Sequence, residues 1–323
     1  MEEVIKVPKA KLNSGHQMPL LAMGTCSSSP QNPDQLTSTL IRAIEMGYRH
    51  FDTAVVYGSE EALGRAVASA VERGLVASRD ELFITTKLWC TETEHHLVVP
   101  ALKRSLGRLG LDYVDLYLIH LPFRAKDSVE DLHFKTENIV PFNMKGTWEG
   151  MENCCKLGLA KSIGVSNFTS KKISQLLQNA TIPPAVNLVE MSVAWQQSKL
   201  LEFCREKGVY VSAWSPLGAN GAMWGNPGLL EIPQLKDIAM AKHKTTAQVA
   251  LRWVYQQGAC VVIVTSFNNE RMKENLQIFN WELEEDEIAK IQQIPQRRGF
   301  KGAEFVHSNG PYKSVEELWD GDI

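Results

Sequence analysis

The sequence predicts an α/β protein built as a closed (β/α)8 barrel of the TIM type, and three observations support that prediction. Apolar runs of strand length alternate with amphipathic helical segments along the 323 residues, and this alternation favours parallel strands. Several of the runs are apolar throughout, as expected for strands that are buried on both faces. The alternation repeats eight times, which favours a closed barrel over an open, doubly wound sheet.

The elements can be placed along the chain from these patterns. A hairpin is expected before the barrel, because residues 5–11 alternate in polarity and the turn-forming Asn13-Ser14-Gly15 follows. Barrel strands are expected at 19–25, 50–54, 82–86, 114–119, 161–166, 185–191, 209–214 and 260–264. Helices are expected at 33–46, 59–73, 95–108, 144–157, 169–178, 197–207, 231–242, 246–256, 269–277 and 284–293. Long loops, 121–143 and the glycine-rich 218–228, should lie over the C-terminal rim of the barrel.

We expect residues 1–323 to form one domain. The tail after about residue 295 is irregular, and a segment that long in a compact domain is usually functional. We therefore expect it to fold over the C-terminal rim and cover the active site.

Composition excludes several classes of partner. The net charge is −3, 22% of the residues are charged, and no cluster of Lys or Arg stands out, so nucleic acid and anionic membranes are poor partners. No apolar run approaches the ~18 residues of a membrane span. The N-terminus lacks the apolar core of a signal peptide. The six cysteines form no CxxC pair and are interpreted as reduced thiols. A cytoplasmic protein is expected.

Four ionisable residues lie at or just beyond the ends of three successive predicted strands: Asp52, Tyr57, Lys87 and His120. In a parallel barrel this C-terminal rim is where chemistry is done. A nearby Lys ammonium is expected to lower the pKa of a tyrosine from its ordinary value of about 10. Asp would keep the ammonium charged, and His could orient a carbonyl group. The set suits proton donation to a carbonyl oxygen.

Other interpretations of these residues stay open. Asp52 and Lys87 could form a structural ion pair, His120 could be a packed polar residue, and Tyr57 could be an inert loop residue. No metal is expected, because the sequence has neither HExxH nor a ligand cluster with zinc-type spacing.

Three stretches, Gly47–Ala54, Leu111–His120 and Lys161–Phe168, closely resemble the signature stretches of the aldo-keto reductase superfamily. The loops around 214–219 and 266–275 resemble its plant branch, which includes codeinone, methylecgonone and chalcone reductases. The resemblance implies a monomeric barrel that binds extended NADPH without a GxGxxG motif, which this sequence lacks. It also implies that Tyr57 is the general acid, that Lys87 and Asp52 tune it, and that His120 orients the substrate carbonyl.

The resemblance further implies a set of cofactor-binding residues. These are Gly24, Thr25, Asp52, Ser166, Asn167, Trp214, Ser215, Leu217, Ser266, Phe267, Arg271 and Asn275. Leu188 stands where the family usually has a glutamine that bonds the nicotinamide carboxamide, a loss of about 0.5–1.5 kcal/mol. Thr265 stands where a lysine usually faces the 2′-phosphate, so weaker discrimination against NADH is expected.

The substrate pocket should be lined by rim loops. The candidates are Ser27, Val56, Trp89, His120, Leu121, Phe123, Trp195, Met223, Trp224 and Phe300. This largely apolar and aromatic lining suits a bulky apolar ketone or aldehyde more than a sugar, although some of these aromatic residues could belong to the core. The leading hypothesis is an NADPH-dependent reductase of plant specialised metabolism, acting on an alkaloid, terpenoid or polyketide. A broad reductase of small aldehydes and a cofactor-binding partner or regulatory protein remain alternatives.

Overall fold

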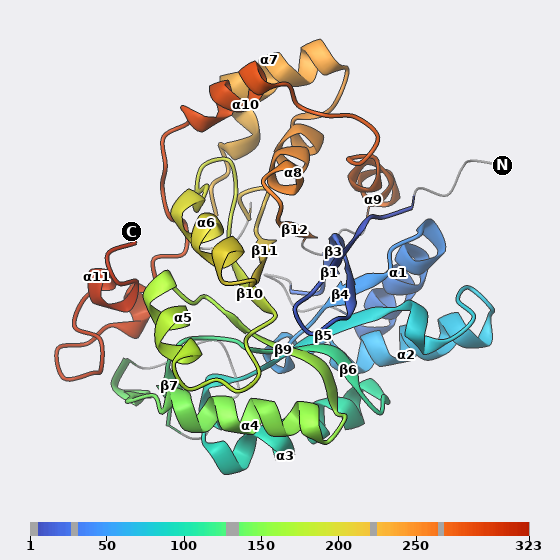
Figure 1. Ribbon diagram of the computed structural model, residues 1–323. Helices are drawn as coiled ribbons and strands as arrows, with labels where there is room; N and C mark the ends of the chain where they lie inside the picture. Colours follow the sequence, from blue (N-terminus) through green and yellow to red (C-terminus); the bar gives the residue numbers. More distant parts are fainter. Residues whose placement is uncertain (1–5, 27–31, 127–135, 220–224, 264–267, 323) are drawn as a thin grey trace.

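The computed structural model describes residues 6–26, 32–126, 136–219, 225–263 and 268–322. Its centre is a closed barrel of eight parallel strands, each paired with the next along the chain, with the last strand returning to the first (Figure 1). The strands are β3 (Leu21–Gly24), β4 (His50–Asp52), β5 (Phe83–Leu88), β6 (Val114–Ile119), β9 (Ala160–Ser166), β10 (Val186–Glu190), β11 (Tyr210–Trp214) and β12 (Cys260–Ile263). The predicted (β/α)8 barrel is confirmed.

The helices surround the barrel (Figure 1). They are α1 (Pro33–Met46), α2 (Glu60–Glu72), α3 (His95–Leu109), α4 (Met144–Lys156), α5 (Ser170–Leu177), α6 (Ser198–Glu206), α7 (Pro233–Lys242), α8 (Thr246–Gln256), α9 (Asn269–Leu276), α10 (Glu285–Gln292) and α11 (Val315–Leu318). Local signals set their ends. Asn32 caps the start of α1 by accepting from two backbone N–H groups, and Gly47 ends it at φ 111°. Thr245 and Gln248 form a capping box on α8.

The predicted hairpin is present and closes the N-terminal end of the barrel (Figure 1). It consists of β1 (Lys9–Lys11) and β2 (Gln17–Pro19), paired antiparallel. The Asn13 side-chain amide in its turn donates to Pro184 O at 2.9 Å and to Gly208 O at 3.1 Å, at loops that precede β10 and β11. Met18 is fully buried with side chains from the barrel strands. The expected strand at 19–25 is therefore wrong at its start, because Pro19 belongs to the hairpin and the barrel strand begins at Leu21.

The sequence analysis did not predict several short elements. The loop after β6 contains a small antiparallel sheet of β7 (Arg124–Ala125) and β8 (Ile139–Val140). The loop after β4 contains the 3-10 turn η1 (Val55–Tyr57), and the tail contains α11. Elements of two to four residues are too short to carry a hydrophobic period.

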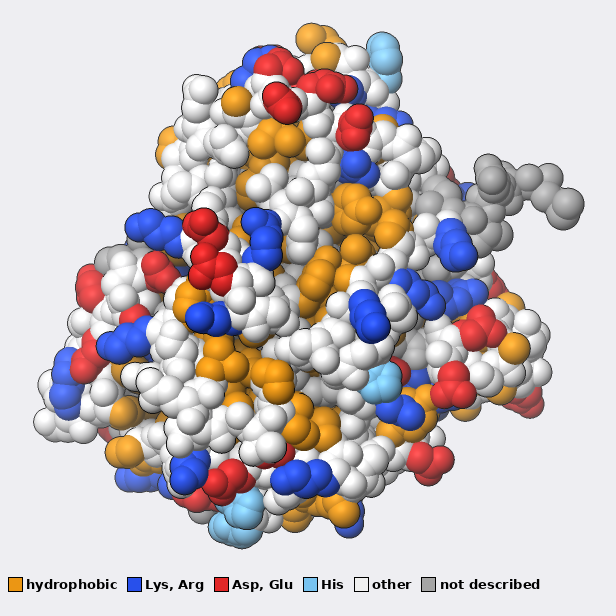
Figure 2. Space-filling model, viewed as in Figure 1, with side chains coloured by type: hydrophobic (Ala, Val, Ile, Leu, Met, Phe, Trp, Pro, Cys, Tyr) orange, Lys and Arg blue, Asp and Glu red, His pale blue; other side chains and the backbone are white. Residues whose placement is uncertain are grey.

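The surface is of mixed charge on the face that Figure 2 shows. Lys and Arg side chains are interspersed with Asp and Glu side chains over the helical layer, in keeping with the net charge of −3. None of the helices among the described residues combines the length and apolar character that crossing a bilayer requires.

Gly164 in β9 is expected to be intolerant of a side chain. A Cβ placed there would lie 2.4 Å from Val186 O, in the backbone of the neighbouring strand, and 2.8 Å from Leu118 Cδ2. Gly164→Ala should lower the free energy of unfolding by about 1–3 kcal/mol, as overpacking does, measured by urea denaturation. Gly107→Ala in α3 is the matched control, because nothing lies within 4 Å of a Cβ there. Equal stability of the two variants would contradict the close packing of β9 on β10.

Candidate active site

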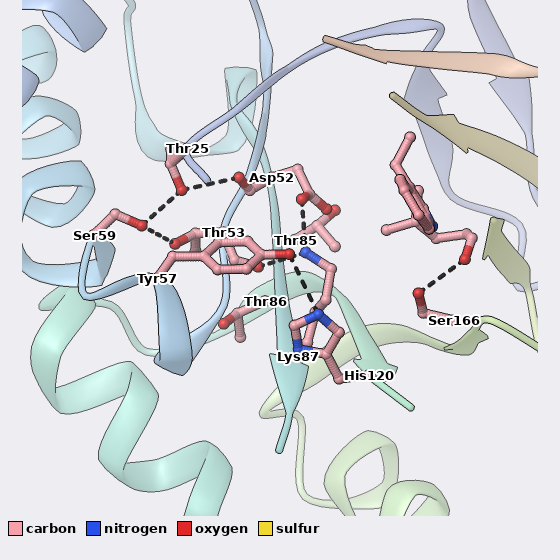
Figure 3. A network of polar contacts seen from close by, with 12 residues as sticks. Thr25, Asp52, Thr53, Tyr57, Ser59, Thr85, Thr86, Lys87, His120 and Ser166 are labelled. Atoms are coloured by element: carbon pink, nitrogen blue, oxygen red, sulfur yellow. Dashed lines mark hydrogen bonds and ion pairs between the residues drawn. The ribbon is translucent and has the colours of Figure 1, made fainter. Parts of the chain in front are cut away.

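Four side chains converge at the C-terminal rim of the barrel (Figure 3). Asp52 ends β4, Lys87 lies near the end of β5, His120 follows β6, and Tyr57 ends the η1 turn. The Lys87 ammonium donates to Asp52 Oδ1 at 2.6 Å and to Thr53 O at 2.9 Å. The Tyr57 hydroxyl lies 3.3 Å from His120 Nε2. The structure therefore brings the predicted tetrad together, and within it Asp52 and Lys87 form a buried ion pair with side chains 7% and 1% exposed.

A chain of hydroxyl groups supports the loop that carries Tyr57 (Figure 3). Thr25 donates to Asp52 O at 3.1 Å, and its Oγ1 lies 2.6 Å from the hydroxyl oxygen of Ser59. Ser59 in turn lies 2.8 Å from the hydroxyl oxygen of Thr53. The three hydroxyls are buried and connect β3 and β4 to the start of α2. Sequence reasoning missed Thr53 and Ser59, because an isolated hydroxyl at a strand end carries no signal of its partner.

The electrostatics of Tyr57 differ from the expectation. Burial, and then the neighbouring Cys26 and Asp52, hold the pKa of Tyr57 well above its ordinary value. The predicted net lowering of the Tyr57 pKa is wrong, because burial outweighs the effect of the nearby ammonium. The Lys87 ammonium is engaged by Asp52 and Thr53 and lies 4.8 Å from the centroid of the Tyr57 ring. Tyr57 is therefore protonated at neutral pH, the form that a proton donor needs.

His120 is held in its neutral form. Burial, with the Lys87 ammonium as second cause, lowers the pKa of His120 well below its ordinary value. Its Nε2 is the atom that faces the Tyr57 hydroxyl, and its ring packs edge-on against Trp89 at a centroid distance of 5.1 Å. Among the described residues, its Nδ1 has no hydrogen-bond partner. A neutral imidazole beside a protonated phenol can share a hydrogen bond with a third oxygen atom without adding charge.

A second polar group lies across the mouth of the barrel. The Asn167 side-chain amide donates to His120 O at 3.0 Å and to Ser166 Oγ at 3.1 Å, and its Oδ1 accepts from Trp214 Nε1 at 3.2 Å. Ser166 donates to Leu188 O at 2.8 Å. Asn167 adopts a left-handed φ of 63°. The residues expected to hold the nicotinamide end of the cofactor are therefore linked to one another and to the backbone of His120.

The other expected cofactor residues are spread over the rim and the helical layer. Gly24 pairs with Asp52, and the N–H of Thr25 donates to Asp52 O at 2.9 Å. Ser215 follows β11 with φ 53°, and Leu217 packs against the main core. On α9, away from the tetrad, Arg271 is exposed and Asn275 is buried. Ser266 and Phe267 lie outside the described residues.

Apolar side chains form what we call the mouth cluster, next to the tetrad. Its buried members are Trp89, Cys90, Leu121, Phe123, Ala125, Ile139, Phe305, Leu318 and Trp319, and its partly buried members are Val55, Val56, Phe300, Val306, Tyr312 and Val315. The cluster includes five of the expected substrate residues. Of these, Trp89, Leu121 and Phe123 are buried, so in this structure they pack beneath the surface, whereas Val56 and Phe300 are partly exposed.

Of the remaining expected substrate residues, only Trp195 and His120 of the tetrad belong to the described residues. The Trp195 ring lies 4.8 Å from the Arg298 guanidinium of the tail and is not part of the mouth cluster. Ser27, Met223 and Trp224 lie outside the described residues.

The C-terminal tail is attached to the rim side of the barrel, near α5 (Figure 1). The Tyr312 hydroxyl donates to Pro122 O at 2.9 Å, and the buried Lys172 of α5 pairs with Asp320 at 2.6 Å.

A separate pocket of about 510 Å³ lies between α4, α5 and the tail, with Trp148, Lys172 and Tyr312 in its wall. That pocket contains none of the tetrad residues. Within the described residues, no group of three or more His, Cys, Asp or Glu side chains could hold a metal ion.

Comparison with known proteins decides the family. A model of the Aldo/keto reductase family matches residues 20–296. The chain belongs to the aldo-keto reductase family. It is 56% identical to rhazimal reductase 2 of Alstonia scholaris over 324 residues, which cover 100% of each chain. It is 53% identical to deoxymugineic acid synthase 1-D of Triticum aestivum, over 95% of this chain and 97% of that one.

A solved aldo-keto reductase has the same fold. The Bombyx mori aldo-keto reductase in complex with NADP is 35% identical and superposes with a TM-score of 0.85, over 95% of this chain and 98% of that one. The protein studied, as a member of this family, is accordingly an NADP-dependent oxidoreductase that reduces carbonyl groups with NADPH.

The residues of this aldo-keto reductase fit that cofactor. The indole of Trp214 is partly exposed, and its N–H is held by Asn167, so a fixed aromatic face lies at the end of β11, suited to stacking of a nicotinamide ring. Ser166 and Asn167 place a hydroxyl and an amide beside that face. Arg271, exposed in the first turn of α9, would hold the 2′-phosphate by a bidentate contact.

Leu188 is expected to weaken cofactor binding. Its side chain is buried among apolar residues in the barrel, and its carbonyl accepts from Ser166, next to the expected carboxamide site. Leu188→Gln would supply the amide that the family usually has there. It should tighten NADPH binding about two- to tenfold, the value of one added hydrogen bond, measured by fluorescence titration. Leu188→Met is the matched control, since it fills a similar volume without an amide. Equal dissociation constants for the two variants would contradict the assigned position of the carboxamide.

Proposed function

We propose that this aldo-keto reductase reduces the carbonyl group of a bulky, largely apolar ketone or aldehyde of plant specialised metabolism, such as an alkaloid, terpenoid or polyketide. The mouth cluster carries the proposal. It places apolar and aromatic side chains next to the tetrad, where Trp89 packs against the His120 ring and Val56 and Phe300 are partly exposed. A charged or sugar-like substrate would need polar partners there. The name of the Alstonia scholaris relative, rhazimal reductase 2, is in keeping with a dedicated reductase.

The geometry supports a division of roles in the tetrad. When bound, NADPH supplies the hydride for the carbonyl carbon. Tyr57, which is protonated at neutral pH, donates its proton to the carbonyl oxygen. Neutral His120 holds that oxygen next to the hydroxyl through Nε2. The Lys87 ammonium, fixed by Asp52, stabilises the negative charge that develops on Tyr57 as the proton leaves. The same groups acting in reverse would oxidise an alcohol.

We propose three further properties of the whole chain. Residues 1–323 act as one domain, with the tail from about residue 295 forming a wall of the active site. The contacts of Tyr312 and Lys172 support this arrangement. The protein works as a monomer in the cytoplasm, as the family resemblance and the composition suggest.

Steady-state kinetics with NADPH and NADH, on one simple aldehyde and a panel of bulky ketones with and without a carboxylate, tests the proposal. We expect a preference for NADPH, a higher kcat/KM for one neutral bulky class than for the simple aldehyde, and poor turnover of carboxylated analogues. Similar efficiency on many simple aldehydes would instead indicate a broad detoxifying reductase. Tight NADPH binding without turnover of any carbonyl compound would indicate a binding or regulatory protein.

A further inference from the structure

Glu190 is a buried carboxylate that the catalytic scheme does not use. It is the last residue of β10, lies in register with Trp214 of β11, and is 8% exposed. One of its oxygens accepts from the N–H of Gly299 and the other from the N–H of Phe300, both at 2.9 Å. A buried carboxylate is costly without such partners. Glu190 therefore connects the end of a barrel strand to a tail segment more than a hundred residues later in the chain.

The side chain of Arg298 holds the same segment through separate contacts. Its guanidinium carbon lies 4.8 Å from the centroid of the Trp195 ring and 4.1 Å from that of the Trp319 ring. Its Nε donates to Asp322 O at 3.0 Å. The guanidinium thus makes cation–π contacts with two indoles. Together with the Glu190 contacts, this arrangement holds the backbone of three consecutive tail residues.

Phe300 is the side chain that this anchored backbone presents to the mouth of the barrel. Its ring centroid lies 5.8 Å from that of Trp214, on the cofactor side, and 5.8 Å from that of Phe305, in the mouth cluster. Phe300 therefore lies between the expected nicotinamide face and the apolar surface expected to meet the substrate. Two backbone hydrogen bonds to the Glu190 carboxylate, together with the Arg298 contacts, hold the backbone that carries it.

We propose that Glu190 is a positioning residue that fixes Phe300 as a wall of the substrate pocket and so sets the preference for bulky over small carbonyl compounds. This inference rests on the proposed function. We expect a small aldehyde to reach Tyr57 and His120 without touching Phe300, and a bulky apolar ketone to gain from contact with its ring. Loss of the contacts that hold residues 298–300 should raise the KM of the ketone more than it changes kcat. The kcat/KM of the small aldehyde should stay unchanged.

The test compares wild type with Glu190→Gln, Phe300→Ala and the double variant, using NADPH with a simple aldehyde and with the best ketone of the panel. Glu190→Gln keeps the shape of the side chain and loses one of the two acceptors. We expect each single variant to lower the ketone-to-aldehyde ratio of kcat/KM about tenfold, mainly through KM, as loss of an apolar pocket contact does. The double variant should show no further loss, because both substitutions remove the same wall.

Several outcomes would overturn the inference. A merely structural Glu190 would lower the active fraction for both substrates and leave their ratio unchanged. Additive losses in the double variant would show that Glu190 does not act through Phe300. If Glu190→Gln fails to fold, Arg298→Lys takes its place in the test. This variant leaves the carboxylate in place and removes the planar guanidinium that contacts Trp319. It must lower the same ketone-to-aldehyde ratio, or the inference fails. A wild type that reduces the aldehyde but no bulky ketone would instead refute the proposed function, which keeps the two failures distinguishable.

Discussion

Tyr57→Phe should lower kcat for every carbonyl substrate by about two to four orders of magnitude, the usual contribution of a general acid, while NADPH still binds. The hydroxyl that is lost lies 3.3 Å from His120 Nε2. Among the described residues, no other hydroxyl hydrogen-bonds to that nitrogen. The ring that remains keeps its place over Lys87, so the cofactor site should stay intact. Stopped-flow turnover and NADPH titration of the same preparation would separate the two effects. Turnover within tenfold of wild type would remove Tyr57 from the assigned role.

Tyr113→Phe is the matched control. The Tyr113 hydroxyl donates to Asp80 on the outside of the barrel and belongs neither to the tetrad nor to the mouth cluster, so this variant should retain wild-type turnover.

The pH profile of the wild type adds an independent check. Because the pKa of His120 is lowered and that of Tyr57 is raised, kcat/KM should stay flat from about pH 6.5 to 9. A change of kcat/KM with pH in that range, present in the wild type and absent from Tyr57→Phe, would show that Tyr57 titrates near neutrality.

The tetrad could be predicted because a parallel barrel places the ends of consecutive strands on one rim. Asp52, Lys87 and His120 need only the correct assignment of three strongly apolar runs to come together. What the sequence could not supply is the direction in which each side chain points. Asp52 and Thr53 O hold the Lys87 ammonium over the ring of Tyr57, and burial of Tyr57, followed by Cys26 and Asp52, raises its pKa where a lowering was expected.

The substrate side was harder for a related reason. Apolar residues after a strand end either line a pocket or pack beneath it, and sequence patterns do not separate the two. Phe123 is 1% exposed because Phe305 of the tail covers it at a centroid distance of 4.6 Å. The contacts of Glu190 with Gly299 and Phe300 span more than a hundred residues without any periodic pattern. Long-range contacts of an irregular tail follow from packing, not from local propensity.

The buried ion pair leads to the second large effect. Lys87→Met should lower the free energy of unfolding by about 3–5 kcal/mol, because it leaves the Asp52 carboxylate buried without its partner. Burial already raises the pKa of Asp52, and Lys87 is the group that opposes this rise. Without Lys87, the carboxyl group should become protonated more readily. Denaturant titration would measure the loss, and activity should fall with it.

Stability and catalysis can be separated with a double variant. Asp52→Leu combined with Lys87→Met replaces the pair by apolar side chains, which in other proteins is often neutral or stabilising. It should recover most of the stability lost in Lys87→Met and still fail to reduce any carbonyl compound. The comparison holds even if Lys87→Met does not fold, since the double variant is then the informative protein. A stable but active double variant would show that the pair is structural, which is the alternative that the sequence leaves open. A stable and inactive one would show that the barrel keeps two charges out of water for the chemistry at Tyr57, because folding does not require them.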